Sequence, residues 1–437
     1  MIKNRTAILA LLTGLNLLNY IDRMIVAAVL KKIQEPVADG GLFLSGLQGG
    51  LLATAFLGGY FVTSPIFGAR ADKGKRTGLI AIGVAIWSVA TFATGLAHSF
   101  GQMLAARVVV GVGEASYATL APTIIDDITP PDRKGKALAV FYLAIPVGSA
   151  LGYLIGGFIE AHWGWRYAFF LAGGPGLVLA LSCLLIVEPE RTLRAAKGKL
   201  LDGLRTIAKL PLFRRGVLGY CAYTAAIGAF AYWAPKYLAE TYAPTFHVEV
   251  VNGMAHLVVV TAGSLSNATA DYYFGLVTVV AGAIGTVVGG QWGDRAVRRV
   301  PHASDLLPWD AGPTKAGTNA LLRVCAISMV FAAPLTALCF VMPTAQLFFA
   351  FAFLAELWLF LSTSPVNAIG LRAVPPELRA SAMAGMIFAI HLFGDLWSPS
   401  VLGLLNDLLI PTVAMMAVPL VFALSAYLWW PRKHEAV

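Results

Sequence analysis

Apolar runs of about 20 residues, each long enough to cross the hydrocarbon core of a bilayer, recur along almost the whole chain. Charged residues make up only 13% of the sequence, whereas a soluble domain carries about 25%. Hydrophobic residues make up 58%, and the mean hydropathy is +0.73. The sequence therefore predicts an all-α integral membrane protein with twelve transmembrane helices.

The predicted spans fall into two sets of six, separated by a basic segment. We expect the spans at 7–30, 47–69, 78–97, 102–124, 136–159, 167–187, 213–235, 272–292, 320–341, 345–366, 380–404 and 411–430. This spacing predicts an N-terminal six-helix bundle over 1–187, a cytoplasmic linker over 188–212 and a C-terminal six-helix bundle over 213–437.

Basic residues indicate the orientation of these spans. The N-terminus, alternate loops and the C-terminal tail hold most of the 32 Lys and Arg, and the opposite loops hold only Lys31, Lys32, Arg166 and Lys236. By the positive-inside rule, both termini are cytoplasmic in a multi-pass protein of the inner (plasma) membrane. The basic residues lie in short patches between apolar runs, which favours a membrane surface over nucleic acid as partner. The first run is too long for a cleavable signal peptide, so we expect it to remain as the first helix.

Several features narrow the function further. The four cysteines all lie inside apolar runs without metal-ligand spacing, so we expect no disulfide, metal or cofactor. A membrane enzyme would need a nucleophile, a metal cluster or a phosphate loop, and the sequence contains no His-x-x-x-His pair, Walker loop or Cys pair. We therefore expect no enzymatic activity. Residues 243–271 are too interrupted to span, and we assign them to an external, interfacial excursion.

A weak internal repeat relates the two sets of spans. Pro130-Pro-Asp-Arg133, after the fourth span, recurs as Pro375-Pro-Glu-Leu-Arg379 after the tenth. The basic turn from Gly68 to Arg76, after the second span, is echoed from Gly290 to Arg299 after the eighth. Either match alone could arise by chance, but both occur in the same order. The repeat predicts two parallel six-helix halves.

Four charged residues stand inside the first and fourth predicted spans: Asp22, Arg23, Arg107 and Glu114. A charge at the centre of a lipid-facing helix costs about 2.5–3.5 kcal/mol, so these side chains must face one another or water. Arg107 and Glu114 are seven residues apart and share a helix face. Asp22 and Glu114 lie at similar depth. Two readings remain open: permanent salt bridges between helices, or the paired carboxylates and arginines of a proton relay.

Fewer charges lie in the second half. Glu356 stands in the tenth span, and His391 and Asp395 share a face of the eleventh. A local packing pair and a functional pair are both open for His391 and Asp395. Arg323 lies near a span end, where it can extend to the interface.

The repeated twelve-span pattern resembles the major facilitator superfamily over essentially the whole chain. The resemblance implies that the first, fourth, seventh and tenth helices line a central cavity. It also implies that the basic turns lock the cytoplasmic face, with these gating residues: Asp72, Arg76, Arg133, Asp294, Arg295 and Arg379. Arg107, Gly111 and Gly113 resemble a fourth-helix motif associated with proton coupling. Gly148, Gly152 and Gly156 resemble the glycine-rich fifth helix, and physically they form a smooth face for close helix packing.

Within that superfamily, three stretches resemble the spinster family of lipid transporters. They are Asn19-Tyr-Ile-Asp-Arg23, Gly113-Glu-Ala-Ser-Tyr117 continuing to Ile125, and Pro146-Val-Gly-Ser-Ala-Leu-Gly-Tyr153. The resemblance implies transport of a lysophospholipid or phosphorylated sphingoid base, coupled to protons. We expect Asp22, Glu114 and Arg107 to carry the proton coupling. The two cavity arginines suit an anionic head group, and aromatic residues suit an apolar tail.

These arguments define a candidate site and two alternative functions. We expect the substrate to be bound by Arg23, Arg107, Tyr20, Tyr117, Glu356, Trp233 and Trp358. The partners are then the bilayer, the amphiphilic lipid or organic anion, and protons, and we expect a monomer. A multidrug or other small organic anion transporter of the same fold is the alternative. A polytopic membrane enzyme is the competitor from a different class.

Overall fold

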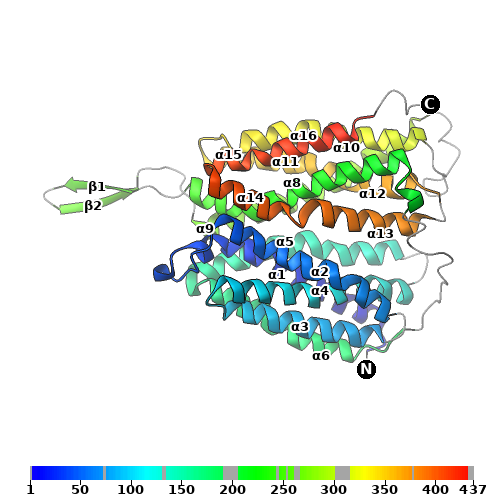
Figure 1. Ribbon diagram of the computed structural model, residues 1–437, viewed down its shortest axis with the longest axis horizontal. Helices are drawn as coiled ribbons and strands as arrows, with labels where there is room; N and C mark the ends of the chain where they lie inside the picture. The colour runs from blue at the N-terminus through cyan, green and yellow to red at the C-terminus, as the bar shows by residue number, and fades with distance from the viewer. Residues whose placement is uncertain are drawn as a thin grey trace. The chain divides into compact units, whose positions relative to one another are not determined.

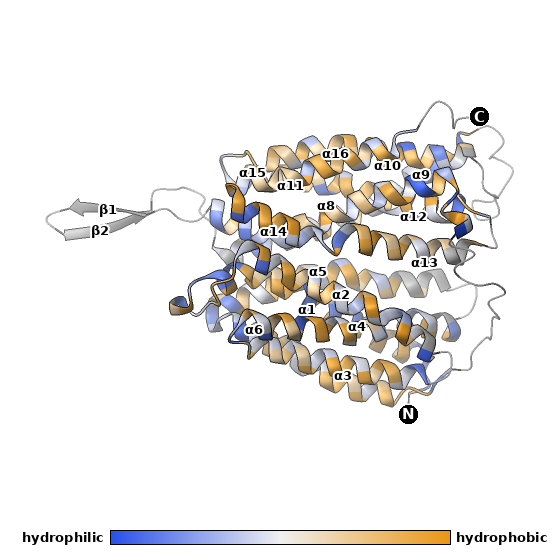
Figure 2. Ribbon diagram, viewed as in Figure 1, coloured by the Kyte–Doolittle hydropathy of each residue, from blue (hydrophilic) through white to orange (hydrophobic). Residues whose placement is uncertain are grey.

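The computed structural model describes residues 2–71, 75–129, 134–189, 205–242, 246–251, 254–259, 266–300, 315–375 and 378–431. Within these ranges, 12 helices are long and apolar enough to cross a membrane, which confirms the predicted all-α membrane fold. Figure 2 shows hydrophobic residues along most of each helix and hydrophilic residues gathered towards the helix ends. A helix satisfies its own backbone polar groups, so it is one of the few structures that can cross lipid.

The first half of the chain forms six long helices, which lie side by side in Figure 1. They are α1 (Arg5–Gln34), α2 (Gly46–Ala71), α3 (Arg76–Gly95), α4 (Phe100–Ile128), α5 (Lys134–Trp163) and α6 (Trp165–Leu184). Side chains cap two of their N-termini. The Asn4 carboxamide oxygen accepts from the backbone N–H of Thr6 at 2.8 Å, and Ser99 accepts from the N–H of Gln102.

The helices of the second half are more often interrupted. They are α8 (Pro211–Thr241), α9 (Asn267–Arg298), α10 (Lys315–Cys339), α11 (Ala345–Leu361), α12 (Thr363–Arg372), α13 (Arg379–Ile390), α14 (Ser398–Leu408), α15 (Pro411–Met415) and α16 (Ala417–Trp429). A π-helical segment, His391–Asp395, joins α13 to α14. The pieces combine into single spans, such as Ala345–Gly370 and Gly385–Leu408. Every predicted span therefore overlaps an observed one.

The contacts divide the chain into two compact units. Unit 1 comprises Met1–Leu193, Ala231–Leu276 and Pro399–Leu408. Unit 2 comprises Arg194–Phe230, Val277–Ser398 and Leu409–Val437. Unit 1 thus contains the first six helices together with the end of α8, the beginning of α9 and most of α14. The predicted division into six-helix bundles over 1–187 and 213–437, with a linker over 188–212, remains a prediction.

Close packing in unit 1 depends on glycine. Along α5, a Cβ added at Gly148 would lie 2.7 Å from the carbonyl oxygen of Leu17, and one at Gly152 would lie 2.7 Å from that of Ile21. A Cβ at Gly156 would lie 2.9 Å from the Ala28 Cβ. The predicted smooth glycine face of the fifth helix is confirmed, and α1 packs against it.

The segment assigned to an external excursion contains the only strands in the described residues. β1 (Phe246–Val251) pairs antiparallel with β2 (Met254–Val259), with Phe246 opposite Val259. The last part of the same segment, from Asn267, is helical and begins α9. The excursion is therefore a hairpin followed by the first turn of a spanning helix, and the interfacial position proposed for it stays a prediction.

Unit 2 packs through α10. This helix contacts both α16 and α11, and its buried face includes Leu322, Cys325 and Met329. Arg215 of α8 donates to the backbone carbonyl oxygens of Leu428 and Trp429 and so satisfies carbonyl groups at the end of α16. Arg323 is exposed, as predicted for a residue that extends towards the interface.

The glycine face of α5 predicts that two alanine substitutions change the melting temperature differently. Gly152→Ala should lower the melting temperature of purified protein, because the new Cβ meets the α1 backbone. Gly174→Ala, on α6, is the matched control, since its Cβ would meet nothing within 4 Å. Alanine favours helix over glycine by about 1 kcal/mol, so Gly174→Ala should leave the melting temperature unchanged or raise it. Equal effects of the two substitutions would contradict the packing account.

Candidate functional site

The four charged residues of the first and fourth spans meet inside unit 1. The Arg23 Nε lies 2.8 Å from Glu114 Oε2 in a hydrogen-bonded ion pair between α1 and α4. Arg107 Nη1 lies 3.9 Å from Asp22 Oδ1 in a second, looser pair between the same helices. The cluster therefore contains two positive and two negative side chains. Its formal charge is balanced, as burial in lipid requires.

Burial differs sharply within this cluster. The side chains of Asp22 and Glu114 are 0% exposed and that of Arg107 is 3% exposed, but Arg23 retains 17%. Arg23 is thus the most exposed member of the cluster. Glu114 lies behind it.

Some polar atoms of the cluster form a hydrogen bond, and others have no partner. Thr91 of α3 donates to Asp22 Oδ2 at 2.5 Å. Among the described residues, Asp22 Oδ1, Glu114 Oε1 and the Nε and Nη1 of Arg107 have no hydrogen-bond partner. A buried polar atom without a partner costs about 1–3 kcal/mol. The two carboxylate oxygens can therefore favourably accept a proton or a hydrogen bond, and the Arg107 nitrogens can donate to a water or a ligand group.

Aromatic rings surround the more exposed arginine. The Arg23 guanidinium carbon lies 4.9 Å from the ring centroids of both Tyr20 and Phe56 and 5.5 Å from that of Tyr60. Arg107 lies 5.1 Å from the Phe56 ring centroid. These cation–π contacts add to the ion pair in positioning the Arg23 guanidinium.

The pairing differs in detail from the simplest sequence argument. Arg107 and Glu114 share a face of α4, but Glu114 pairs with Arg23, and Arg107 faces Asp22. Sequence reasoning also missed Thr91, Phe56 and Tyr60. A threonine or an aromatic residue in an apolar run carries no signal of its own.

Two of the aromatic candidates lie in packed surroundings in unit 1. Tyr117 is fully buried, packs against Trp87 and donates from its hydroxyl to the Leu12 carbonyl oxygen at 2.5 Å. Trp233 is 1% exposed, and its Nε1 donates to the Pro399 carbonyl oxygen at 2.9 Å. Both side chains therefore already have their polar atoms satisfied.

The other candidates lie in unit 2. Trp358 stacks on Phe331 with centroids 4.5 Å apart, and Phe331 is exposed on the outer surface of its helix. Glu356 is 3% exposed and accepts from Thr278 at 3.1 Å, while its other oxygen has no partner among the described residues. Glu356 is thus a further buried carboxylate, in unit 2.

The predicted pair in the eleventh span is in contact. His391 Nδ1 lies 3.1 Å from both carboxylate oxygens of Asp395, and the π-helical segment brings the two together over one turn. Both side chains are partly exposed, at 31% and 23%. The contact is compatible with either of the readings that the sequence left open.

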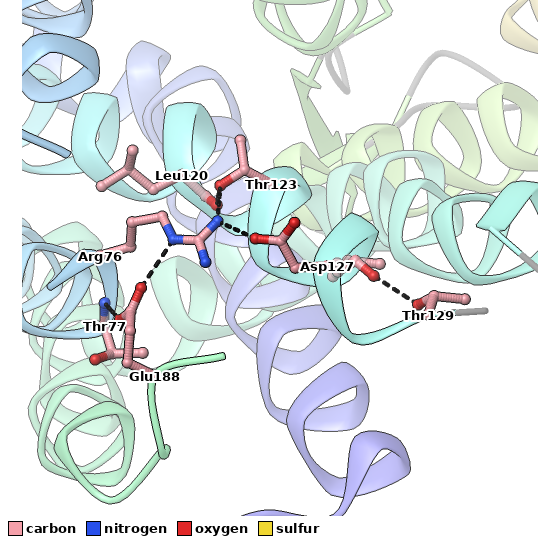
Figure 3. A network of polar contacts seen from close by, with 8 residues as sticks. Arg76, Thr77, Leu120, Thr123, Asp127, Thr129 and Glu188 are labelled. Carbon is pink, nitrogen blue, oxygen red and sulfur yellow. Dashed lines mark hydrogen bonds and ion pairs between the residues drawn. The ribbon is translucent and has the colours of Figure 1, made fainter. Parts of the chain in front are cut away.

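Arg76 connects three parts of unit 1 at the end that carries the N-terminus (Figure 3). Its Nη1 lies 2.6 Å from Asp127 near the end of α4, and its Nε donates to Glu188, just after α6, at 2.9 Å. Thr123 accepts a further hydrogen bond from Nη1. The first basic turn therefore contributes a buried arginine that fastens α3, α4 and the segment after α6 to one another.

The remaining predicted gating residues are placed less fully. Asp72 and Arg133 lie outside the described residues, as does the side chain of Arg379. Asp294 and Arg295 are exposed near the end of α9 in unit 2.

The Arg76 network predicts an acid-sensitive contribution to stability. Partial burial of Glu188 opposes its ionisation, but hydrogen bonds from the Arg76 guanidinium and the Thr77 N–H outweigh burial and lower the pKa of Glu188. The contribution is therefore fully present above the ordinary glutamate pKa and is lost as pH falls through the lowered one. We expect the melting temperature difference between the wild type and Glu188→Gln to be largest near neutral pH and to shrink in acid. A difference that stays constant across that range would contradict this prediction.

A second set of contacts lies at the opposite end of unit 1, here called the distal face. It comprises α14, the ends of α1, α5 and α8, and the beginnings of α2 and α9. Lys31 Nζ donates to the Ala239 carbonyl oxygen at 3.0 Å, and the Tyr232 hydroxyl donates to that of Gly49 at 2.7 Å. The hydroxyl oxygens of Thr54 and Ser400 lie 2.6 Å apart and share a hydrogen bond.

Backbones meet directly at the distal face. A Cβ at Gly46 would collide with the Gly403 carbonyl oxygen, and one at Gly50 with that of Pro399. The Asp407 carboxylate of α14 accepts from the first N–H groups of α2, those of Gly46 at 2.5 Å and Leu47 at 2.8 Å. An acceptor at this position satisfies unpaired donors and favours the helix dipole.

The Asp407 cap predicts how easily the distal face opens. Asp407→Ala removes an N-terminal cap worth typically about 1 kcal/mol, so the population in which α2 and α14 separate should rise roughly fivefold. The reporter is Thr54→Cys, labelled by a membrane-impermeant maleimide after the four buried native cysteines are replaced by alanine. Asp39→Ala, which removes an exposed carboxylate near the same end, is the control. Unchanged labelling in Asp407→Ala would show that the cap does not hold the distal face.

Comparison with known proteins identifies relatives over most of the chain. The model of the Major Facilitator Superfamily matches residues 12–394. Protein spinster homolog 1 of Bos taurus is 33% identical over 416 residues, which cover 92% of this chain and 72% of that protein. Probable sphingolipid transporter spinster homolog 3 of Arabidopsis thaliana is 30% identical over 444 residues, covering 90% and 78%.

Solved structures share the fold. A bacterial homolog of the human lysosomal transporter Spinster, in an inward-facing and unoccupied conformation, superposes with a TM-score of 0.79 at 21% identity, covering 98% of this chain and 97% of that one. A nucleoside transporter superposes with a TM-score of 0.67 at 14% identity, covering 97% of both chains.

Proposed function

Because the chain belongs to the Major Facilitator Superfamily, and within it to the spinster-type transporters, we propose that it moves an amphiphilic lipid across the membrane by proton-coupled alternating access. It is a multi-pass membrane transporter with twelve candidate spans. The proposed substrate is a lysophospholipid or a phosphorylated sphingoid base. The name of the Arabidopsis thaliana relative, a probable sphingolipid transporter, supports that class.

The observation that carries this proposal is the Arg23–Glu114 ion pair. Arg23 is partly exposed and ringed by aromatic side chains, whereas Glu114 is sealed behind it. An anionic head group and the Glu114 carboxylate would compete for the same guanidinium. If Glu114 takes up a proton, Arg23 is released from its partner and can pair with the head group.

The second pair keeps the site balanced during this exchange. Arg107 and Asp22 are 3.9 Å apart, beyond hydrogen-bonding distance, so a small helix shift changes their interaction. In our proposal, alternating access alters the distances among these four groups and hence the proton affinity of Glu114 and Asp22. A ligand can shift a conformational equilibrium only by its differential affinity for the two states, and a shared proton supplies that difference.

The proposal also includes the movement of the two halves, the orientation of the protein in the membrane and the closing of its cytoplasmic face. We propose that the halves over 1–187 and 213–437 move as the two rocking bodies, with both termini in the cytoplasm and the inner (plasma) membrane as the location. The transporter would act as a monomer, with the bilayer, the lipid and protons as its partners. Arg76 would hold the first half rigid during the movement, and Asp72, Arg133, Asp294, Arg295 and Arg379 would close the cytoplasmic face. Glu356 would contact substrate from the second half, along with Trp233, Trp358, Tyr20 and Tyr117.

Neutralising the buried carboxylates tests the coupling. Glu114→Gln should leave the protein folded and able to bind lysolipid but abolish the acceleration of transport by a pH gradient, because the glutamine cannot exchange a proton. Asp22→Asn should impair pH-driven transport similarly if the two carboxylates share the proton. The measurement is flux of labelled lysolipid in proteoliposomes with and without an imposed pH step, with binding assayed separately.

The control is Asp39→Asn, which removes an exposed carboxylate and should transport like the wild type. Full pH-driven flux in both Glu114→Gln and Asp22→Asn would reduce the cluster to structural salt bridges. Thermal stabilisation by a panel of organic anions and drugs, but not by lysolipids, would favour the alternative substrate class instead.

A further inference from the structure

A second buried carboxylate site lies in unit 1, away from the cluster of α1 and α4. It sits where α5 packs against the beginning of α9. The Tyr153 and Phe274 rings meet edge to face with centroids 5.4 Å apart, and a Cβ at Gly275 would lie 3.2 Å from the Ala150 carbonyl oxygen. These contacts define the faces that the two helices present to each other.

Two acidic residues lie on those same faces, nearer the distal face. Glu160 follows Tyr153 by seven residues along α5, and Asp271 precedes Gly275 by four along α9. Because α5 ends and α9 begins at the distal face, both steps lead in the same direction. Glu160 accordingly interacts electrostatically with Asp271.

Asp271 is sealed from solvent, and one of its carboxylate oxygens has no donor among the described residues. Its side chain is 1% exposed, and its Oδ2 has no hydrogen-bond partner within the described part of the chain. Glu160 is partly buried. Since a buried carboxylate without hydrogen bonds or a counter-charge is costly, this arrangement requires something to compensate it.

The neighbouring charges do not supply that compensation directly. Lys31 and Lys32 of α1 and Glu35 just after it act on Glu160. Lys32, however, pairs with Glu35 at 2.5 Å, and Lys31 donates to the Ala239 carbonyl oxygen. No basic side chain in the described ranges forms an ion pair with Asp271.

We propose that Asp271 and Glu160 form a second proton-binding site, whose shared proton holds the beginning of α9 against α5 and so keeps the distal face closed. One proton between two carboxyl groups removes their like-charge repulsion, and its O–H supplies the missing donor. When the proton leaves, the two carboxylates repel across the contact. Only the beginning of α9, up to residue 276, belongs to unit 1. The contact between Asp271 and Glu160 therefore holds that part of α9 within the unit. The site does not depend on which substrate is carried, nor on Glu114.

The distal-face reporter tests this inference without substrate. Labelling of the thiol in Thr54→Cys, normalised to the rate of free cysteine at each pH, should be slow at an acidic pH and several-fold faster at an alkaline pH. Asp271→Asn places an amide donor opposite Glu160, and Glu160→Gln places one opposite Asp271. Each variant should label slowly at both pH values.

Asp39→Asn, an exposed carboxylate change at the same end, is the matched control and should keep the pH dependence of the wild type. In a Glu114→Gln background, adding Asp271→Asn should still slow labelling at the higher pH, which separates this site from the proposed coupling cluster. Melting temperatures establish that each variant is folded, and having two independent variants guards against the loss of either.

The inference is overturned if Asp271→Asn and Glu160→Gln keep the wild-type pH dependence. It is also overturned if the dependence is absent from the wild type, or disappears in Glu114→Gln instead. Labelling that responds to sodium at constant pH, rather than to protons, would assign the site to a metal cation and reject the proton. Loss of pH-driven lipid flux in Glu114→Gln, together with a remaining pH dependence of labelling that Asp271→Asn removes, would support both proposals as separate sites.

Discussion

Charge compensation in a medium without water governs this molecule more than any other interaction. The ion pair between Arg23 and Glu114 can exist inside unit 1 because each side chain cancels a cost that the other would incur alone. The same requirement determines which helices must stay adjacent. α1 and α4 each carry one acidic and one basic member, so neither can turn its charged face to lipid without separating both pairs. Packing then has to serve this arrangement, and the α5 glycines do so by bringing the Asp22 and Arg23 helix close to its neighbour.

Most of the fold could be predicted from the sequence, because a lipid environment makes the pattern simple. Hydrophobic length alone is enough to locate every span, and the spacing of Gly148, Gly152 and Gly156 by itself indicates a close contact. The breaks within spans were harder. The π-helical turn at His391–Asp395 and the separation of α11 from α12 leave little trace in hydropathy, since backbone irregularity depends on local hydrogen bonding and packing. The hairpin before α9 was also missed, because short strands outside the membrane lack the length that makes a span recognisable.

The candidate site was predictable in its members but not in its pairing. Charged residues in apolar runs are conspicuous, so all four members of the cluster could be named. Which carboxylate meets which arginine depends on helix rotation and on side-chain reach, and these are tertiary properties. For the same reason the sequence did not indicate that Tyr117 and Trp233 satisfy their polar atoms on backbone carbonyls. Asp271 and Glu160 were overlooked because each stands near the end of a span, where an acidic residue looks like part of a solvated loop. Only the contact between α5 and α9 shows that one of them is sealed.

The backbone contact between α2 and α14 has a consequence for how sequences of this kind can vary. At Gly46, Gly50 and Gly403 there is no room for even one methyl group, and the contact partner is a rigid carbonyl rather than a flexible side chain. Any substitution there acts as a wedge whose effect depends little on its chemistry. Random mutagenesis should therefore be strongly asymmetric at this seam: polar and apolar replacements alike will bias the protein towards separation of the two helices, and none will tighten them. Many single substitutions can therefore loosen the contact between α2 and α14, and almost none can make it tighter.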